Sequence, residues 1–300
     1  MNRYDNNNKE KKRSVSVSAV VRLVIWAVVL CVLVALFTLG MLGDSDTVLG
    51  GINLGGFRYD DSGYSVGNGT VSERVTDITV DWIEGSVTVI PWDGEEISIS
   101  EDYMGDDDDM ALRWRIRDGE LTVKYCAPVR ILKRTADKNL TLKIPAAMLE
   151  GLKEVEIDGT DCDVTFEGNV DELSVDTVDG ELDIRGNIGE MELDAVDGNV
   201  TFKGAVRKAN LDCVDAAVVM YLDMADELNF DQVDGDVTLY LSEDITGFRA
   251  EMETVGGGIV LEGFENEASN GRKHARWGDG SLLIQVDGVD CHLHIKKARG

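Results

Sequence analysis

Pairs of aspartates recur at a fixed spacing through the middle of the chain. The two members of a pair are three residues apart, and corresponding members of successive pairs are 18 or 19 residues apart. The pairs therefore form two series. The ten residues are Asp158, Asp161, Asp176, Asp179, Asp194, Asp197, Asp212, Asp215, Asp231 and Asp234. Carboxylate oxygens are the ligands that calcium prefers, so these aspartates are candidate calcium ligands.

The segments that carry the pairs are copies of one pattern between Val155 and Leu241. The five copies read VEIDGTDCDVTFEG, LSVDTVDGELDIRG, MELDAVDGNVTFKG, ANLDCVDAAVVMYL and LNFDQVDGDVTLYL. Apolar and polar residues alternate in each, which is typical of a β-strand with one buried face, and Asp-Gly favours a tight turn between two strand pieces. One copy cannot bury its apolar face alone, whereas stacked copies can. The pattern therefore predicts an all-β fold, a β-solenoid (β-helix-like) of about 18-residue repeats. A β-sandwich with regularly spaced strands is the alternative, although its turns would vary more in length.

Stacking would bring like charges close together. Adjacent carboxylates of one series would lie about 4.8 Å apart, which costs roughly 0.9 kcal/mol per pair in water and about 0.5 kcal/mol at physiological salt. Two arrangements could relieve this repulsion. The side chains could splay into solvent and accept N–H groups of the turns, or calcium could bridge neighbouring repeats. The calcium-binding GGxGxD pattern is absent from the sequence, which favours solvated side chains and no cofactor.

Paired aspartates also occur in polysaccharide-cleaving enzymes, but here every repeat carries the same pair. Catalysis needs one pair whose surroundings separate its pKa values from those of the other carboxyls. A lyase would also need a basic residue beside the acids, and no Ser/His/Asp or Cys/His set can be built from this sequence. His292 and His294 alternate on one expected strand face without a third ligand of clear spacing, which favours a surface pair over a metal site. We therefore expect no enzymatic activity.

The cysteines and tryptophans have structural interpretations. Cys162 and Cys213 would lie three repeats or about 14 Å apart, whereas a disulfide needs Cα atoms within roughly 7 Å. We expect all five cysteines to be reduced packing residues. Four tryptophans near the ends of the repeat array are expected to cap its core rather than to bind sugars. They are Trp82, Trp92, Trp114 and Trp277.

The N-terminal region predicts a membrane anchor. Residues 1–22 are polar and basic, and residues 23–42 form an uncharged apolar stretch long enough for one transmembrane α-helix. The positive-inside rule places residues 1–22 in the cytoplasm and everything after the span outside. A cleavable signal peptide is the alternative, but it would have a shorter apolar core and a small-residue cleavage site. Residues 43–70 are rich in Gly, Asp and Ser and indicate a flexible stalk, and residues 71–297 are expected to form the extracytoplasmic β-solenoid, clearest over 155–241.

Net charge limits the class of partner. The chain carries 57 acidic and 29 basic residues, a formal charge of −28. Phosphate binding needs a basic surface, so nucleic acid is excluded as an expected partner.

Several segments share their order with a known family. TVDWIEGSVTVIPWDGEEISISE, KNLTLKIP, the repeated TVDG and WGDGSLLIQVDGVD occur in this order. In this respect residues 71–297 resemble the putative-adhesin family of bacterial β-strand-repeat proteins, a domain-of-unknown-function family common in Gram-positive bacteria. The resemblance implies a solenoid-like extracytoplasmic domain without established enzymatic activity. The chain differs from the family in having mostly Asp where Ser or Thr is usual around the repeated turn.

Two functions are consistent with these features. The first is a single-pass cell-membrane protein that acts as a surface interaction module, adhesin-like or an envelope scaffold, whose partner is a cell-envelope polymer or a host-surface ligand. The second is a membrane-tethered sensor or accessory protein of an envelope-stress pathway, whose partner is a membrane signalling protein.

Overall fold

The computed structural model describes residues 59–128, 136–149, 151–264 and 273–298. The expected tail, span and most of the expected stalk lie outside these residues. Contacts within the chain divide it into Met1–Ile52 and Asn53–Gly300, and the following concerns the second unit alone. None of the helices in the described ranges has the length and apolarity needed to cross a membrane.

The all-β prediction is confirmed for the described residues, which contain seventeen strands in one sheet and a single four-residue helix. The first eight strands are β1 (Ser65–Val66), β2 (Gly69–Val71), β3 (Asp77–Asp81), β4 (Glu84–Trp92), β5 (Ile97–Glu101), β6 (Arg113–Arg117), β7 (Glu120–Lys124) and β8 (Lys138–Pro145). Helix α2 (Ala146–Leu149) follows. The remaining strands are β9 (Glu154–Asp158), β10 (Asp161–Glu167), β11 (Val170–Asp179), β12 (Leu182–Leu241), β13 (Gly247–Val255), β14 (Gly258–Glu262), β15 (His274–Gly278), β16 (Leu282–Val289) and β17 (Cys291–Lys297).

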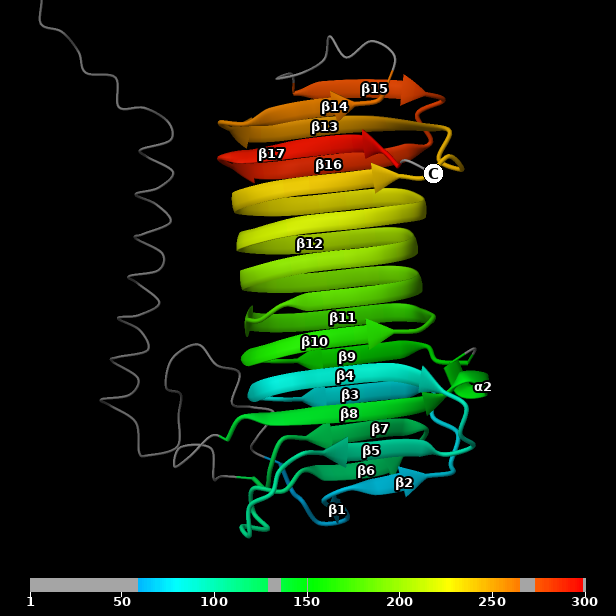
Figure 1. Ribbon diagram of the computed structural model, residues 1–300, viewed down its shortest axis with the longest axis vertical. Coiled ribbons are helices and arrows are strands. Elements are labelled where there is room, and N and C mark those ends of the chain that lie inside the picture. Colours follow the sequence, from blue (N-terminus) through cyan, green and yellow to red (C-terminus); the bar gives the residue numbers. More distant parts are fainter. Residues whose placement is uncertain (1–58, 129–135, 150, 265–272, 299–300) are drawn as a thin grey trace, which may run out of the picture. The chain divides into compact units, whose positions relative to one another are not determined.

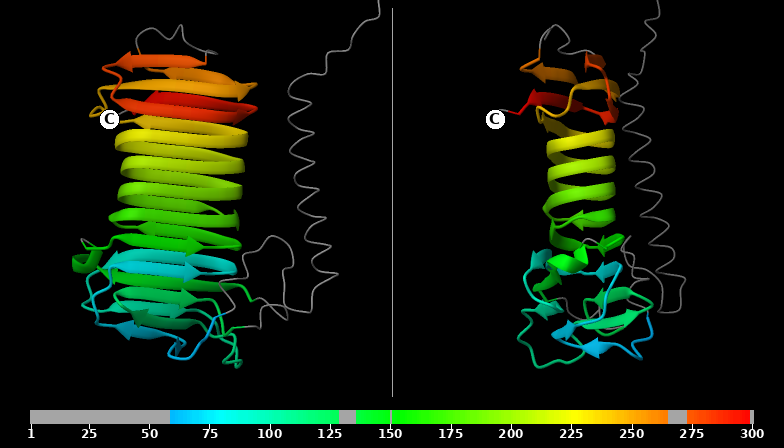
Figure 2. Two further views of the ribbon diagram at one scale, coloured as in Figure 1. Left: turned by 180° about the vertical axis from the view of Figure 1, so that it is seen from behind. Right: turned by 90° about the vertical axis from the view of Figure 1, so that its right-hand side faces the viewer.

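Central strands pair in parallel with their own sequence repeat. Leu173 in β11 lies between Val155 in β9 and Met191 in β12, 18 residues away on either side. β12 winds continuously through several circuits of the chain, each of which we call a coil (Figure 1). The narrow view shows that each coil is flat, with strands on two opposite sides (Figure 2). Alternate residues point between these sides, so one continuous core forms along the stack.

Glycine permits the sharp turn at one edge of several coils. Gly180 and Gly198 have φ values of 148° and 134°, which side chains rarely adopt. A Cβ on Gly198 would also lie 2.0 Å from the carbonyl oxygen of Gly180 in the coil below. Conformation and close backbone approach therefore favour glycine at these two positions, although another coil makes the same turn with Ala216.

The N-terminal end differs in detail from the sequence prediction. β6 pairs with β7, and β5 pairs with β2 and β8. The folded unit also begins before residue 71, because part of the expected stalk forms β1 and β2. Aromatic residues explain this earlier start, since the Tyr59 hydroxyl donates to the Cys126 carbonyl at 2.5 Å and the rings of Tyr59 and Tyr64 are 5.0 Å apart.

A buried ion pair stabilises this end. Lys138 is fully buried, and its Nζ donates to Glu101 Oε2 and to the Met110 carbonyl, both at 2.8 Å. Its ammonium also lies 4.9 Å from the centre of the Trp82 ring. The ammonium is thus paired and hydrogen-bonded, as a buried charge must be.

At the C-terminal end the coils do not stack in chain order. β16 and β17 pair with the last coil of β12, while β13 and β14 pair with the other side of β16 and β17. The last coil in the sequence therefore lies between two coils that precede it, as Figure 1 shows in red between yellow and orange. β15 closes the end by antiparallel pairing with β13.

Candidate functional site

The first aspartate series forms one continuous line of carboxyl groups, which we call the acid row. Asp158, Asp176 and Asp194 are in register on adjacent strands, and Asp212 and Asp231 follow at the same repeat position. Strand pairing extends the row by one acid at its N-terminal end and two at its C-terminal end. The complete row is Asp81, Asp158, Asp176, Asp194, Asp212, Asp231, Asp287 and Glu253. The sequence predicted five of these as neighbours.

Mutual proximity and partial burial disfavour ionisation along the row. Burial raises the pKa of the Asp176 carboxyl, and the carboxylates of Asp158 and Asp194 raise it further. The pKa of Asp231 is raised in the same way, first by burial and then by Asp212 and Asp287. The carboxyl pKa values of Asp158, Asp194 and Asp212 are raised too, with burial as the largest cause in each.

A lysine terminates the row at its N-terminal end. Lys124 is in register with Asp81, and the two side chains form a buried ion pair. Burial lowers the pKa of Lys124, while the Asp158 carboxylate counteracts this effect. The positive charge at this end therefore neutralises one carboxylate and leaves the rest of the row negative.

The second aspartate series has different surroundings. Asp161 is in register with Asp179, and Asp179 with Asp197. Asp215 and Asp234 follow at the same repeat position, and all five are exposed. In the first series only Asp158 is half-buried, and the other four members are exposed as well. The two series differ because these four line a groove, whereas no member of the second series does.

The solvent-splayed arrangement agrees in part with the structure, because Asp176, Asp194, Asp212 and Asp231 are exposed. Among the described residues, no three His, Cys, Asp or Glu side chains are gathered in a way that could hold a metal ion. Turn N–H groups are accepted instead by Asp163, whose Oδ1 accepts from Glu181 at 2.8 Å, and by Asp236, which accepts from His292 at 3.1 Å. Calcium binding by the ten candidate aspartates stays a prediction.

Exposed valines form a second line beside the acid row. We call this line the valine row, and it consists of Val178, Val196, Val214, Val233, Val289 and Val255. Val178, Val196 and Val214 are 44%, 48% and 46% exposed, although valine is usually buried. A groove of about 420 Å³ runs between the two rows, and Ala195 and Cys213 contribute to its floor. The signal for the valine row in the sequence was the valine that precedes the second aspartate of each pair from Asp179 to Asp234. The alternation had not assigned this valine to either face of the strand.

Two amide oxygens beside the acid row have no hydrogen-bond donor within the described part of the chain. They are Oε1 of Gln232 and Oδ1 of Asn229. Gln232 is only 2% exposed, lines the groove, and donates from Nε2 to the Ala216 carbonyl. Asn229 lines a second groove on the other side of the acid row, where its amide donates to Asn210 Oδ1 at 3.0 Å. A buried acceptor without a donor costs free energy, so these two oxygens reduce the stability of the fold at this site.

The histidine pair has an acidic neighbour that the sequence did not reveal. Asp236 lies beside both rings, with Oδ1 3.1 Å from Nδ1 of His292 and Oδ2 3.8 Å from Nε2 of His294. The displaced last coil brings these residues together across 56 positions of sequence.

Four cysteines are confirmed as free and buried, namely Cys126, Cys162, Cys213 and Cys291. Burial raises the pKa of each thiol, to about 11 for Cys126 and Cys291. They are therefore unreactive packing groups. Cys31 lies outside the described residues.

The tryptophans have separate roles. Trp277 packs against Phe264 and Phe248 at the C-terminal end, with ring centroids 5.0 and 6.1 Å away. Trp114 is partly buried, and its indole donates to the Gly67 carbonyl at the N-terminal end. Both positions agree with capping. Trp82, in contrast, is fully buried inside the core, where it donates to the Lys138 carbonyl at 2.9 Å.

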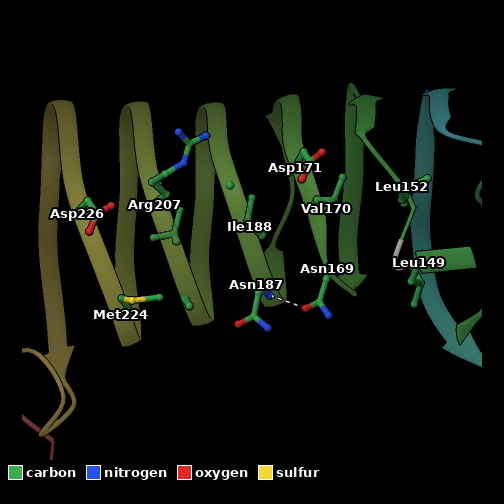
Figure 3. A pocket seen from close by; sticks show the side chains of 13 residues that line it. Leu149, Leu152, Asn169, Val170, Asp171, Asn187, Ile188, Arg207, Met224 and Asp226 are labelled. Carbon is green, nitrogen blue, oxygen red and sulfur yellow. Dashed lines mark hydrogen bonds between the residues drawn. The ribbon is translucent and has the colours of Figure 1, made fainter. Parts of the chain in front are cut away.

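The opposite edge of the coils carries a third groove, of about 550 Å³ (Figure 3). Its wall contains Val170 and Ile188, and the Asn187 N–H donates to Asn169 Oδ1 at 2.9 Å. Arg207 lies here together with two acidic side chains. The mixed charges give this groove no clear preference for a charged ligand.

Comparisons with known proteins found similarity in solved structures. No family model and no curated protein matches the chain. A putative adhesin from Bacteroides fragilis is 12% identical, with a TM-score of 0.46 over 77% of this chain and 97% of the other. A putative cell adhesion protein from Clostridium sporogenes is also 12% identical, with a TM-score of 0.33 over 78% of this chain and 100% of the other.

Proposed function

We propose that this chain is a surface interaction module, a β-solenoid of about 18-residue coils held at the cell membrane by a helix over residues 23–42. The domain after the span lies outside the cytoplasm and binds its partner along the acid row. It does not catalyse a reaction. The partner is an envelope or host-surface component, consistent with an adhesin-like or scaffold role.

The observation that carries this proposal is the continuity of the acid row and the valine row across adjacent coils. Exposed apolar side chains in line are unusual on a protein that binds nothing, and they commonly mark interaction sites. Here the apolar line lies directly beside a line of carboxylates. An enzyme would need one acid pair set apart from the rest, whereas the carboxyl pKa values of Asp176, Asp194 and Asp212 are all raised, with burial as the largest cause in each.

Site-specific photocrosslinking in intact cells tests this function. A photoreactive residue replaces Val196 in the groove or, as a control, Asn199, which is exposed on the other side of the same coil. We expect crosslinked partners from position 196 and few from position 199. Equal crosslinking from both positions, or none from position 196, would contradict the proposal.

The identity of the crosslinked partner separates the two roles. A wall polymer or a host ligand supports the surface module. A membrane kinase or regulator supports the sensor or accessory role in an envelope-stress pathway instead.

A further inference from the structure

The groove beside the acid row combines three chemical features in parallel lines. The acid row forms one wall and the valine row the other, and the residue between them on each strand faces inward and forms the floor. Asp194, Ala195 and Val196 show this order within one coil. The same order recurs in successive coils, so each coil adds one carboxylate and one apolar side chain.

The polar groups of the groove are mostly hydrogen-bond acceptors. None of the described residues that line it is a lysine or an arginine. The acid row supplies carboxylate oxygens, and the floor supplies the Gln232 Oε1, which has no donor within the described ranges. A matching ligand must therefore bring positive charge to one wall and apolar groups to the other.

We propose that this groove binds an extended peptide segment of a partner protein in which basic and apolar residues alternate. This inference rests on the proposed function and names the class of partner. Successive side chains of an extended strand point to opposite sides. Lysine or arginine would thus face the acid row while every other residue covers the valine row.

The dimensions of the groove set the length of the segment. Adjacent coils are about 4.8 Å apart and an extended chain rises about 3.3 Å per residue. The five coils from Val178 to Val289 therefore span about 19 Å, the length of roughly six peptide residues. The flexible stems of lysine side chains would absorb the difference between the two spacings.

Two synthetic peptides of identical composition test this arrangement on the full-length chain in lipid nanodiscs. In the first, four lysines and four valines alternate, and in the second they form two blocks. We expect the alternating peptide to bind at least tenfold more tightly by calorimetry. Equal affinities would overturn the proposal, because charge alone would then explain binding.

Variants locate the binding site. Asp194→Asn with Asp212→Asn should weaken binding of the alternating peptide about tenfold, and Val196→Ser with Val214→Ser should remove its advantage over the block peptide. Glu243→Gln with Asp244→Asn is the matched control, since it removes two exposed carboxylates from the turn after β12. An equal loss in this control would overturn the proposal. Melting curves of each variant confirm that it is folded.

The outcome also separates this inference from the proposed function. If neither peptide binds while crosslinking from position 196 in cells persists, the groove has a partner of another kind and only the peptide inference fails. If both fail, the groove is not an interaction site.

Discussion

Neutralising the middle of the acid row should stabilise the folded domain. The double substitution Asp194→Asn with Asp212→Asn removes three in-register repulsions, those of Asp194 with Asp176, of Asp194 with Asp212 and of Asp212 with Asp231. Each costs about 0.5 kcal/mol at a separation of about 4.8 Å and physiological salt. The variant should therefore gain about 1.5 kcal/mol. For a domain of this size that gain corresponds to a rise of about 3 to 6 °C in Tm.

The sign of the pH dependence follows from the raised pKa values. A carboxyl whose pKa is higher in the folded than in the unfolded state binds more protons when folded, so stability falls as pH rises between the two values. For the acid row the penalty is absent below the ordinary aspartate pKa of 3.8 and complete above the raised folded values. The advantage of the variant should thus be greatest at neutral pH and vanish towards pH 3.8.

Thermal unfolding followed by circular dichroism, at several pH values and salt concentrations, measures this difference. The control is Glu243→Gln with Asp244→Asn, which changes the net charge equally but lies outside the acid row. At low salt the gain should increase, because screening weakens. A variant no more stable than the wild-type protein, or a control that gains as much, would refute the electrostatic reasoning.

Four other predictions follow from the sequence and the fold. If calcium bridges the two aspartate series, the domain should have a higher Tm in calcium than in chelator. At 100 times the dissociation constant, calcium should add about 2.7 kcal/mol to the free energy of unfolding, and magnesium should add less. An unchanged Tm in both ions would exclude cation binding. Deleting residues 176–193 should leave a folded domain shorter by one coil, whereas deleting nine residues should unfold it, as circular dichroism would show. Lys138→Met should cost about 3 to 5 kcal/mol in chemical denaturation because it leaves the Glu101 carboxylate buried and unpaired, and adding Glu101→Gln should recover part of that loss. Protease added to intact protoplasts should digest the chain beyond about residue 45, and protection of the C-terminal domain would contradict the proposed topology.

The central fold was predictable because alternation and period agree there. Every repeat carries apolar residues at the same positions, and residues 18 apart do pair in parallel. The two ends were not predictable in the same way. At the N-terminal end, the pairing of β5 with β2 and β8 depends on contacts across tens of residues, which local patterning cannot specify.

The sequence could predict which acidic residues belong to the candidate site but not what surrounds them in the fold. The sequence identifies the aspartates of both series, yet only tertiary packing determines that members of the first series line the groove and members of the second do not. The valine row went unrecognised because a single exposed valine is ordinary, and only the stacking of coils makes the valines contiguous. Gln232 was equally inaccessible to sequence reasoning, since its unsatisfied oxygen is a property of geometry.

The exchanged order of the last two coils shows how the acid row and the valine row are assembled. Asp287 comes before Glu253 along the stack, although Asp287 comes later in the sequence. Both residues continue the acid row without a break. Val289 and Val255 continue the valine row in the same way. The continuity of the two rows therefore depends on which residue type occupies each position of a coil and not on the order in which the coils are connected. Because each coil from Asp176 to Glu253 along the stack contributes one carboxylate and one valine, the affinity for an extended partner should scale with the number of these coils that the partner covers.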